Sequence, residues 1–399
     1  MPSALAVTGI PANLQDAIAN IDTDPVQRER RADLLARSFE LRSGRERPGR
    51  FWKVDLEALD YSSVRVAAPS APAISKPANR NVVACDLASA LRSHRDIVER
   101  ALGRAVNPAA SKFAALAAAM QNTGALVYVP ADIAVDDPIE IAYDARDGAL
   151  FPRTLVLVEA GARCTVIERL TGSADAFLCG ITEIVTAENA AVTYAVDQQL
   201  ADGARTFFTR SAKPGKDARV QWAVAELGGA LSVTSLEVTV DEPGVHADLA
   251  GIFFPRVDQH VDLISNVDHN AGNSSSETIV KSAAIGRGQA RYLGNIRIVQ
   301  HAQGTEASLR DDALLLSTKA HIDSIPALEI AANDVKAYHG ATVGAIDEEQ
   351  IFYMTSRGID RESAENMIAL GFFEPAVARF PTEALRARLR EALEAKVRA

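Results

Sequence analysis

The residue of this chain that is best placed for chemistry is His339, in the segment DVKAYHGATVG (334–344). Ala337 and Ala341 leave little bulk beside its imidazole ring. No cysteine follows Cys179, so metal chemistry at this end of the chain must use nitrogen or oxygen ligands. An imidazole nitrogen can complete an iron or iron–sulfur site whose thiolates come from another chain. A structural or surface histidine is the simpler alternative.

The other candidates for chemistry carry weaker signals. Asp311 and Asp312 are adjacent, and neighbours in a strand point to opposite faces, so they are not expected to form a facing acid–base pair. Cys164 and Cys179 lie in strand-like segments and are interpreted as buried thiols, with sulfur handling as the alternative. The remaining histidines lack close metal-ligand spacings and are interpreted as structural or surface residues: His94, His246, His260, His269, His301 and His321.

Several motifs of catalysis and nucleotide binding are absent from the sequence. It contains no GxxxxGK[ST] phosphate loop, no GxSxG nucleophile elbow and no HExxH zinc motif. The pattern therefore predicts a protein with little chemistry of its own, and not an enzyme.

The composition is that of a large acidic globular protein, with 399 residues, 48% hydrophobic residues and a formal net charge of −10. An acidic chain has no general attraction to phosphate backbones, so nucleic acid is not expected as a partner. The longest apolar stretch, 114–120, is far shorter than the roughly 18 residues of a membrane span. The first residues lack the basic region of a signal peptide. Three cysteines without CxxC spacing indicate free thiols in a reducing compartment, and we predict a cytoplasmic location.

The pattern changes from helical to strand-like near Gly124. Before it, periodic apolar positions predict helices, for example over 26–42. From Gly124 to about Val343, short β-rich runs alternate with tight polar turns, and hardly any helical pattern interrupts them.

Turn residues recur at regular intervals in this strand-rich region. They are Gly161, Asn189, Gly215 and Gly244, with gaps of 28, 26 and 29 residues. Such spacing is typical of stacked repeats, each of which needs a neighbour to bury its apolar face. The pattern favours a β-solenoid, with a β-sandwich or jelly roll as the alternative.

Helical patterns return after the strand-rich region. Asp347 is a predicted N-cap, and Gly358 is the predicted left-handed residue at the end of that first helix. Asp360 is expected to cap a second helix, which Gly371 is expected to end. The chain is thus predicted to have three parts: a helical region over 1–120, a β-solenoid over 121–345 and a helical region over 346–399.

Segments near the C-terminus resemble the SufB/SufD family of iron–sulfur cluster assembly proteins, and its SufD-type members most of all. The resemblance is strongest in ALLLS (313–317), PALEI (326–330), DVKAYHGATVG (334–344) and IFYMTSRGI (351–359). Two weaker similarities lie upstream. GALVYVPADI (124–133) resembles the segment that opens the family's β-helix, and FWKVDLEAL (51–59) resembles its N-terminal Trp-Lys motif.

The resemblance implies a right-handed parallel β-helix between helical ends, in a non-catalytic subunit of a cytosolic complex. The implied partners are a SufB-like subunit and an ABC-type ATPase, SufC. A transient iron–sulfur cluster or iron would form at the SufB–SufD interface, with none permanently bound. His339 matches the SufD histidine that contributes to cluster or iron handling, while the key thiolate comes from SufB. The hairpin 351–373 resembles the region that docks the ATPase, with Phe352, Tyr353, Arg357 and Gly358 as candidate docking residues.

Two departures from the family pattern matter. Ala337 stands where many SufD sequences have a cysteine, two residues before the histidine. The chain also lacks the C-terminal cysteine ligand of SufB-type members, which favours the SufD type. Two alternatives remain: a homodimeric scaffold, and a β-helix enzyme acting on polysaccharides, for which the sequence shows neither a signal peptide nor an evident acid pair.

Overall fold

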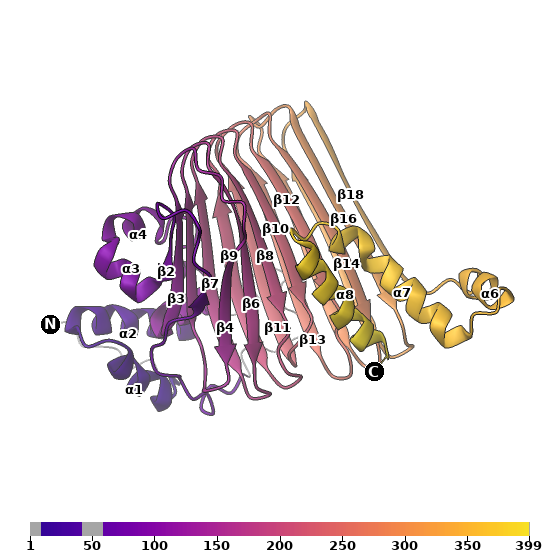
Figure 1. Cartoon of the computed structure of the whole chain (residues 1–399), viewed down its shortest axis with the longest axis horizontal. Coiled ribbons are helices and arrows are strands. Elements are labelled where there is room, and N and C mark those ends of the chain that lie inside the picture. The colour runs from indigo at the N-terminus through magenta and orange to yellow at the C-terminus, as the bar shows by residue number, and fades with distance from the viewer. Residues whose placement is uncertain (1–8, 42–58, 399) are drawn as a thin grey trace.

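The computed structural model describes residues 9–41 and 59–398. Most of these residues form a parallel β-solenoid, in which the chain winds back and forth between two sheets (Figure 1). Within this part of the chain each sheet has nine strands. The predicted fold, a mainly β solenoid with helices at both ends, is confirmed.

The strands of the two sheets alternate along the chain. The first sheet contains, in spatial order, β1 (Ala73–Ile74), β4 (Ile139–Ala145), β6 (Arg163–Gly172), β8 (Ala191–Gln198), β10 (Arg219–Glu226), β12 (His246–Phe253), β14 (Ser275–Ala284), β16 (Thr305–Leu315) and β18 (Val335–Ala345). The second sheet contains β2 (Val83–Asp86), β3 (Thr123–Val129), β5 (Pro152–Val158), β7 (Phe177–Thr186), β9 (Arg205–Lys213), β11 (Leu231–Val240), β13 (His260–His269), β15 (Gln289–Ile298) and β17 (His321–Ile330).

Parallel pairing places equivalent residues of successive turns in rows across each sheet. One such row runs through Leu249, Thr278, Leu309 and His339. The two short strands β1 and β2 differ from the rest, because they pair antiparallel with β4 and β3 at the N-terminal edge of each sheet.

Residues with positive φ stack at one corner of the solenoid. They are Asp132, Gly161, Asn189, Asp217, Gly244, Asn273 and Gly304, spaced 27 to 31 residues apart. Aspartate, asparagine and glycine are the residues that tolerate this left-handed conformation best. The predicted repeat is therefore correct, but its third turn residue is Asp217 and not Gly215. A Cβ added to Gly244 would come within 1.8 Å of Asp217 Oδ1, so successive turns press directly on one another.

Apolar side chains from both sheets fill the interior of the solenoid. Trp222, Tyr194 and Tyr292 are among the largest fully buried ones. The interior also holds a fully buried ion pair, in which Arg210 Nη2 lies 2.8 Å from Glu168 Oε1. Because both charges have lost their hydration, this pair is stable only through such direct contact.

Helices cover the N-terminal part of the solenoid (Figure 1). They are α1 (Ala12–Ile21), α2 (Pro25–Glu40), α3 (Leu87–Ser93), α4 (Arg95–Ala101), a 3-10 turn (Pro108–Ala110) and α5 (Lys112–Met120). Phe113 of α5 stacks on Phe207 of β9, with ring centroids 4.3 Å apart, so this layer packs on the outer face of the second sheet. The FWKVDLEAL motif lies almost entirely outside the described residues.

Three helices follow the last strand: α6 (Glu348–Ser356), α7 (Arg361–Val377) and α8 (Glu383–Arg398). The N-caps predicted for α6 and α7, Asp347 and Asp360, each accept a hydrogen bond from a backbone N–H. The predicted end of α7 at Gly371 is wrong, because the helix continues to Val377. Burial of Phe373 and Val377 against the solenoid outweighs the cost of about 1 kcal/mol for a glycine inside a helix.

Helices α7 and α8 lie across the outer face of the first sheet, while α6 projects beyond the last strand (Figure 1). Among the helices of the described residues, none is long and apolar enough to cross a membrane.

Candidate functional site at the open end of the solenoid

The C-terminal end of the solenoid is open. β17 and β18 are the outermost strands of their sheets at this end, and most of their side chains are partly or fully exposed. Val343 and Ile330 expose 44% and 41% of their surface, although equivalent positions in earlier turns are buried. An edge strand with free backbone groups and an exposed apolar face is typical of a surface that binds another chain.

His339 lies on β18, at this open end. In the register it pairs with Leu309 of β16, which is buried in the interior of the solenoid. Alternation along the strand therefore places His339 on the inward face, together with Ala337, which packs against the interior cluster. Because no further turn of the described residues covers β18, the imidazole is exposed despite its inward direction.

Asp311 lies one strand behind, on the same inward face. It pairs with Ala341, two residues along β18 from His339. Its Oδ2 accepts a hydrogen bond from Ser324 of β17, while its buried Oδ1 has no hydrogen-bond partner in the described part of the chain. Burial raises the pKa of Asp311 to about 7, and the charge of neighbouring Asp312 acts in the same direction. The open end thus contains a carboxyl group that can gain or lose a proton near neutral pH.

Asp312 points to the outer face of the same sheet, as the alternation predicts. Its two oxygens accept hydrogen bonds from Thr342 Oγ1 on β18, at 2.7 Å, and from Lys281 Nζ on β14, also at 2.7 Å. Burial acts to raise the pKa of Asp312, but these two hydrogen bonds and the charge of Lys281 together lower it. Asp312 is therefore an ionised group that joins three neighbouring strands.

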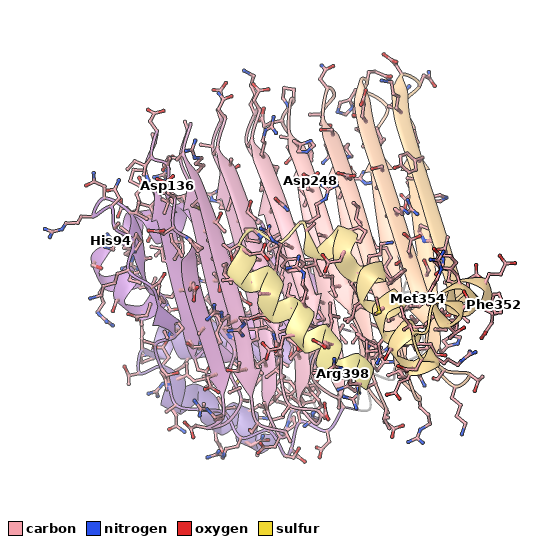
Figure 2. All side chains as sticks on the ribbon, turned by 45° about the vertical axis from the view of Figure 1, so that its right-hand side comes forward. His94, Asp136, Asp248, Phe352, Met354 and Arg398 are labelled. Carbon is pink, nitrogen blue, oxygen red and sulfur yellow. The ribbon has the colours of Figure 1, made fainter. Side chains whose placement is uncertain are left out.

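Helix α6 carries the predicted docking residues. Phe352 and Tyr353 expose 74% and 61% of their surface, and Phe352 lies on the side of α6 away from the strands (Figure 2). Arg357 ends the helix, with its guanidinium carbon 5.3 Å from the centre of the Tyr353 ring. Gly358 follows with φ of +88°, the left-handed conformation that was predicted. A hollow of about 550 Å³ separates α6 from the turn after β16 and from α7.

The cysteines lie far from this end in the sequence, and two of them are buried. Burial raises the pKa of Cys164 to about 12 and raises that of Cys179 as well, so both thiols are protonated at neutral pH. A thiol in this state is a poor nucleophile and a poor metal ligand. Their interpretation as buried thiols is confirmed.

Other histidines have local polar partners. Three of them bond to the aspartate two residues later in the same strand: His246 to Asp248, His260 to Asp262 and His321 to Asp323. His269 is buried inside the solenoid between the hydroxyls of Ser274 and Ser276, and burial lowers its pKa to about 4. In the regions that the structure describes, no three His, Cys, Asp or Glu side chains form a group that could hold a metal ion.

The sequence interpretation missed Lys281, Thr342 and Ser324 as neighbours of the two aspartates. They are polar residues in strands, and only the register of the solenoid brings them to β16. The adjacency of Asp311 and Asp312 did predict their opposite directions, but it gave no information about which side chains would meet them.

Comparison with protein families decides the classification. Residues 141–372 match the family described as "SUF system FeS cluster assembly, SufBD core domain", and residues 47–141 match the "SufBD protein N-terminal region". The chain belongs to the SufB/SufD family. Together the two matches include most of the solenoid, His339, α6 and most of α7.

Curated members of the SufB/SufD family give consistent results. The iron–sulfur cluster assembly protein SufD of Bacillus subtilis is 30% identical over 80% of this chain and 75% of its own length. SufB of the same organism is 28% identical over 76% of this chain and 66% of its own length. An iron–sulfur cluster assembly SufBD family protein of Staphylococcus epidermidis is also 28% identical, over 76% of this chain and 66% of its own. The chain is thus an iron–sulfur cluster assembly protein of this family.

Proposed function

We propose that this chain is a SufD-like scaffold subunit that pairs with a SufB-like subunit through its open solenoid end. The observation that carries the proposal is the position of His339 on an uncovered edge strand. The free edge of β18 and the exposed side chains of Val343 and Ile330 would be covered by a terminal turn of the partner. Such pairing combines backbone hydrogen bonds with apolar burial.

In this arrangement His339 contributes to the handling of iron or of a nascent iron–sulfur cluster, which is cargo and not a resident cofactor. The imidazole supplies one nitrogen ligand, and the SufB-like subunit supplies thiolate. Ala337 provides no ligand, so the contribution of this chain depends on His339. The chain itself is a non-catalytic subunit of a cytoplasmic complex.

The α6 arm is the proposed docking site for a SufC-like ATPase. Phe352 and Tyr353 present two exposed aromatic rings on a short helix, and Arg357 lies beside them. Tyrosine and arginine are enriched among the residues that contribute most to protein binding, and aromatic residues in general are enriched at the cores of interfaces. In the absence of the SufB-like partner, we expect the free edge of β18 to pair with a second copy of this chain.

The decisive experiment replaces His339 by alanine in the complete complex. We expect His339→Ala to leave copurification with the SufB-like and SufC-like subunits unchanged, because the exposed ring supports no described contact of the fold. Cluster formation, followed by visible absorption during anaerobic reconstitution, should fall at least tenfold. A normal yield from this variant would remove His339 from the mechanism, and failure to copurify with a SufB-like chain would reject the pairing.

A further inference from the structure

Asp312 is the buried centre of a polar cluster on the outer face of the first sheet. The cluster consists of Lys281, Asp312 and Thr342, which occupy one row of the register on β14, β16 and β18. Asp312 exposes 4% of its surface, and both of its oxygens accept hydrogen bonds at 2.7 Å within this cluster. Arg310 Nε adds a contact of 2.9 Å from the solvent side.

Helix α7 covers one end of this cluster. The ammonium of Lys281 lies 4.6 Å from the centre of the Phe372 ring, which is within the range of a cation–π contact. The next residue, Phe373, is fully buried and packs against Phe254, directly after β12, with ring centroids 5.8 Å apart. The position of α7 therefore determines what covers Lys281.

Thr342 is itself exposed, but its hydroxyl attaches β18 to a buried acceptor, Asp312, inside the solenoid wall. The other described side-chain hydrogen bond between β18 and β16 joins Lys336 to Glu306, whose side chains are 81% and 61% exposed. Exposed ion pairs of that kind are screened by solvent and hold a strand only weakly. The contact between Thr342 and Asp312 is short, partly buried and made to an ionised acceptor that is itself almost fully buried, which is the stronger class of hydrogen bond.

We propose that the Asp312 cluster couples helix α7 to strand β18 and thereby positions His339, which lies three residues before Thr342. Lys281, Asp312 and Thr342 are positioning residues in this scheme, since they lie on the opposite face of the sheet from the imidazole. The inference rests on the proposed role of His339. It adds a physical connection between helix α7 and the edge strand β18, where iron or the nascent cluster would be bound.

A pair of variants of Thr342 tests the connection in the full-length chain. Thr342→Val removes the hydroxyl at nearly constant shape, and Thr342→Ser keeps it. Amide hydrogen exchange of the β18 residues that bond to β16 should be at least tenfold faster in the valine variant and close to the parent rate in the serine variant. Exchange in β8 and β10 should not change. Unchanged exchange in the valine variant, or equal acceleration in both variants, would overturn the proposal.

The contribution of α7 is tested with Phe372→Leu, which keeps an apolar side chain but removes the aromatic ring over Lys281. This variant should also accelerate exchange in β18, and Phe372→Leu combined with Thr342→Val should be no faster than Thr342→Val alone. Such non-additivity is expected when two residues act through one connection. Additive effects, or no effect of Phe372→Leu on β18, would show that α7 and β18 are independent.

A functional measurement separates this inference from the proposed function. In the assembled complex, Thr342→Val should lower cluster yield at least threefold, and Thr342→Ser should restore it, with subunit composition unchanged. If His339→Ala lowers the yield but Thr342→Val does not, the coupling fails while the role of His339 stands. If His339→Ala has no effect, the proposed function fails, and the exchange experiment then reports on the strand alone.

Discussion

Asp311 and Asp312 are neighbours in β16, yet they have opposite electrostatic environments. Asp311 points into the solenoid, where burial favours its neutral form and raises its pKa to about 7. Asp312 points outward to Lys281 and Thr342, which favour its ionised form and lower its pKa. Two adjacent carboxyl groups thus respond to pH in opposite ways, and each response can be measured.

In the parent chain, the free energy of unfolding should depend on pH through the carboxyl group of Asp311. The Asp311→Asn variant should lack this dependence. The carboxyl binds its proton more tightly in the folded chain than in the unfolded chain, where the ordinary pKa is 3.8. Parent stability should therefore decrease as pH rises from 4 to 8, by up to about 4 kcal/mol from this group. Urea unfolding of both proteins at pH 5 and pH 8 checks this, and an equal pH response in the two would contradict the burial of Asp311.

Asp312→Asn is the matched control, with the opposite sign. Because the folded pKa of Asp312 is lowered, its stabilising contribution is present above the unfolded pKa and is lost as pH falls through the folded value. The asparagine variant should be less stable than the parent at pH 7, and the difference should shrink at pH 3. A difference that does not depend on pH would mean that the charge of Asp312 contributes nothing.

Removal of Lys281 should leave the carboxylate of Asp312 without its main cation. We expect Lys281→Met to destabilise the chain by about 3 kcal/mol, the lower end for a broken buried ion pair, because Arg310 still donates to Asp312. The double variant Lys281→Met/Asp312→Asn should be more stable than the sum of the two single effects predicts. Thermal or urea unfolding of the four proteins gives this interaction energy, and strict additivity would argue against the pair.

His269 should make the solenoid sensitive to acid. Its pKa is lowered from 6.5 to about 4 by burial, so the unfolded chain binds this proton first as pH falls. Stability from this group should be complete above pH 6.5 and should decline by about 3 kcal/mol as pH falls to 4. His269→Gln should show a correspondingly weaker loss between pH 7 and pH 4. The comparison fails if both proteins lose stability equally over that interval.

The α6 arm should be separable from the fold. Phe352→Ser combined with Tyr353→Ser is expected to leave the melting temperature within about 2 °C, because both rings are largely exposed. Copurification of the SufC-like ATPase should fall at least tenfold. Val26→Ser on α2, which is also largely exposed but lies among the N-terminal helices, provides the control and should retain the ATPase. Retention of the ATPase by the double variant would place its docking site elsewhere.

Local patterns predicted the fold well because a solenoid repeats local information. The turn positions Gly161, Asn189 and Gly244 have positive φ as their spacing suggests, and the helix caps Asp347 and Asp360 act as predicted. The errors have local causes as well. Gly215 and Asp217 belong to the same turn, in which Asp217 takes the positive φ. The burial of Phe373 allows α7 to continue past Gly371.

The environment of the site could not be predicted in the same way. Lys281, Asp312 and Thr342 are separated by 31 and 30 residues, and only the exact pairing of three strands brings them into contact. The ion pair of Glu168 and Arg210 could not be predicted either, because the two residues lie in different sheets and meet only across the interior of the solenoid. A shift of one residue in either sheet would send each of these side chains to the opposite face.

The two ends of the solenoid differ in what they allow. At the N-terminal end, the short antiparallel strands β1 and β2, of two and four residues, close the edges and offer little backbone for another chain to join. At the other end, β17 and β18 are full-length and free. A solenoid with a free strand edge at only one end can pair with one further chain along its axis. If the proposed pairing takes place through this edge, it stops at two chains and does not grow into a filament.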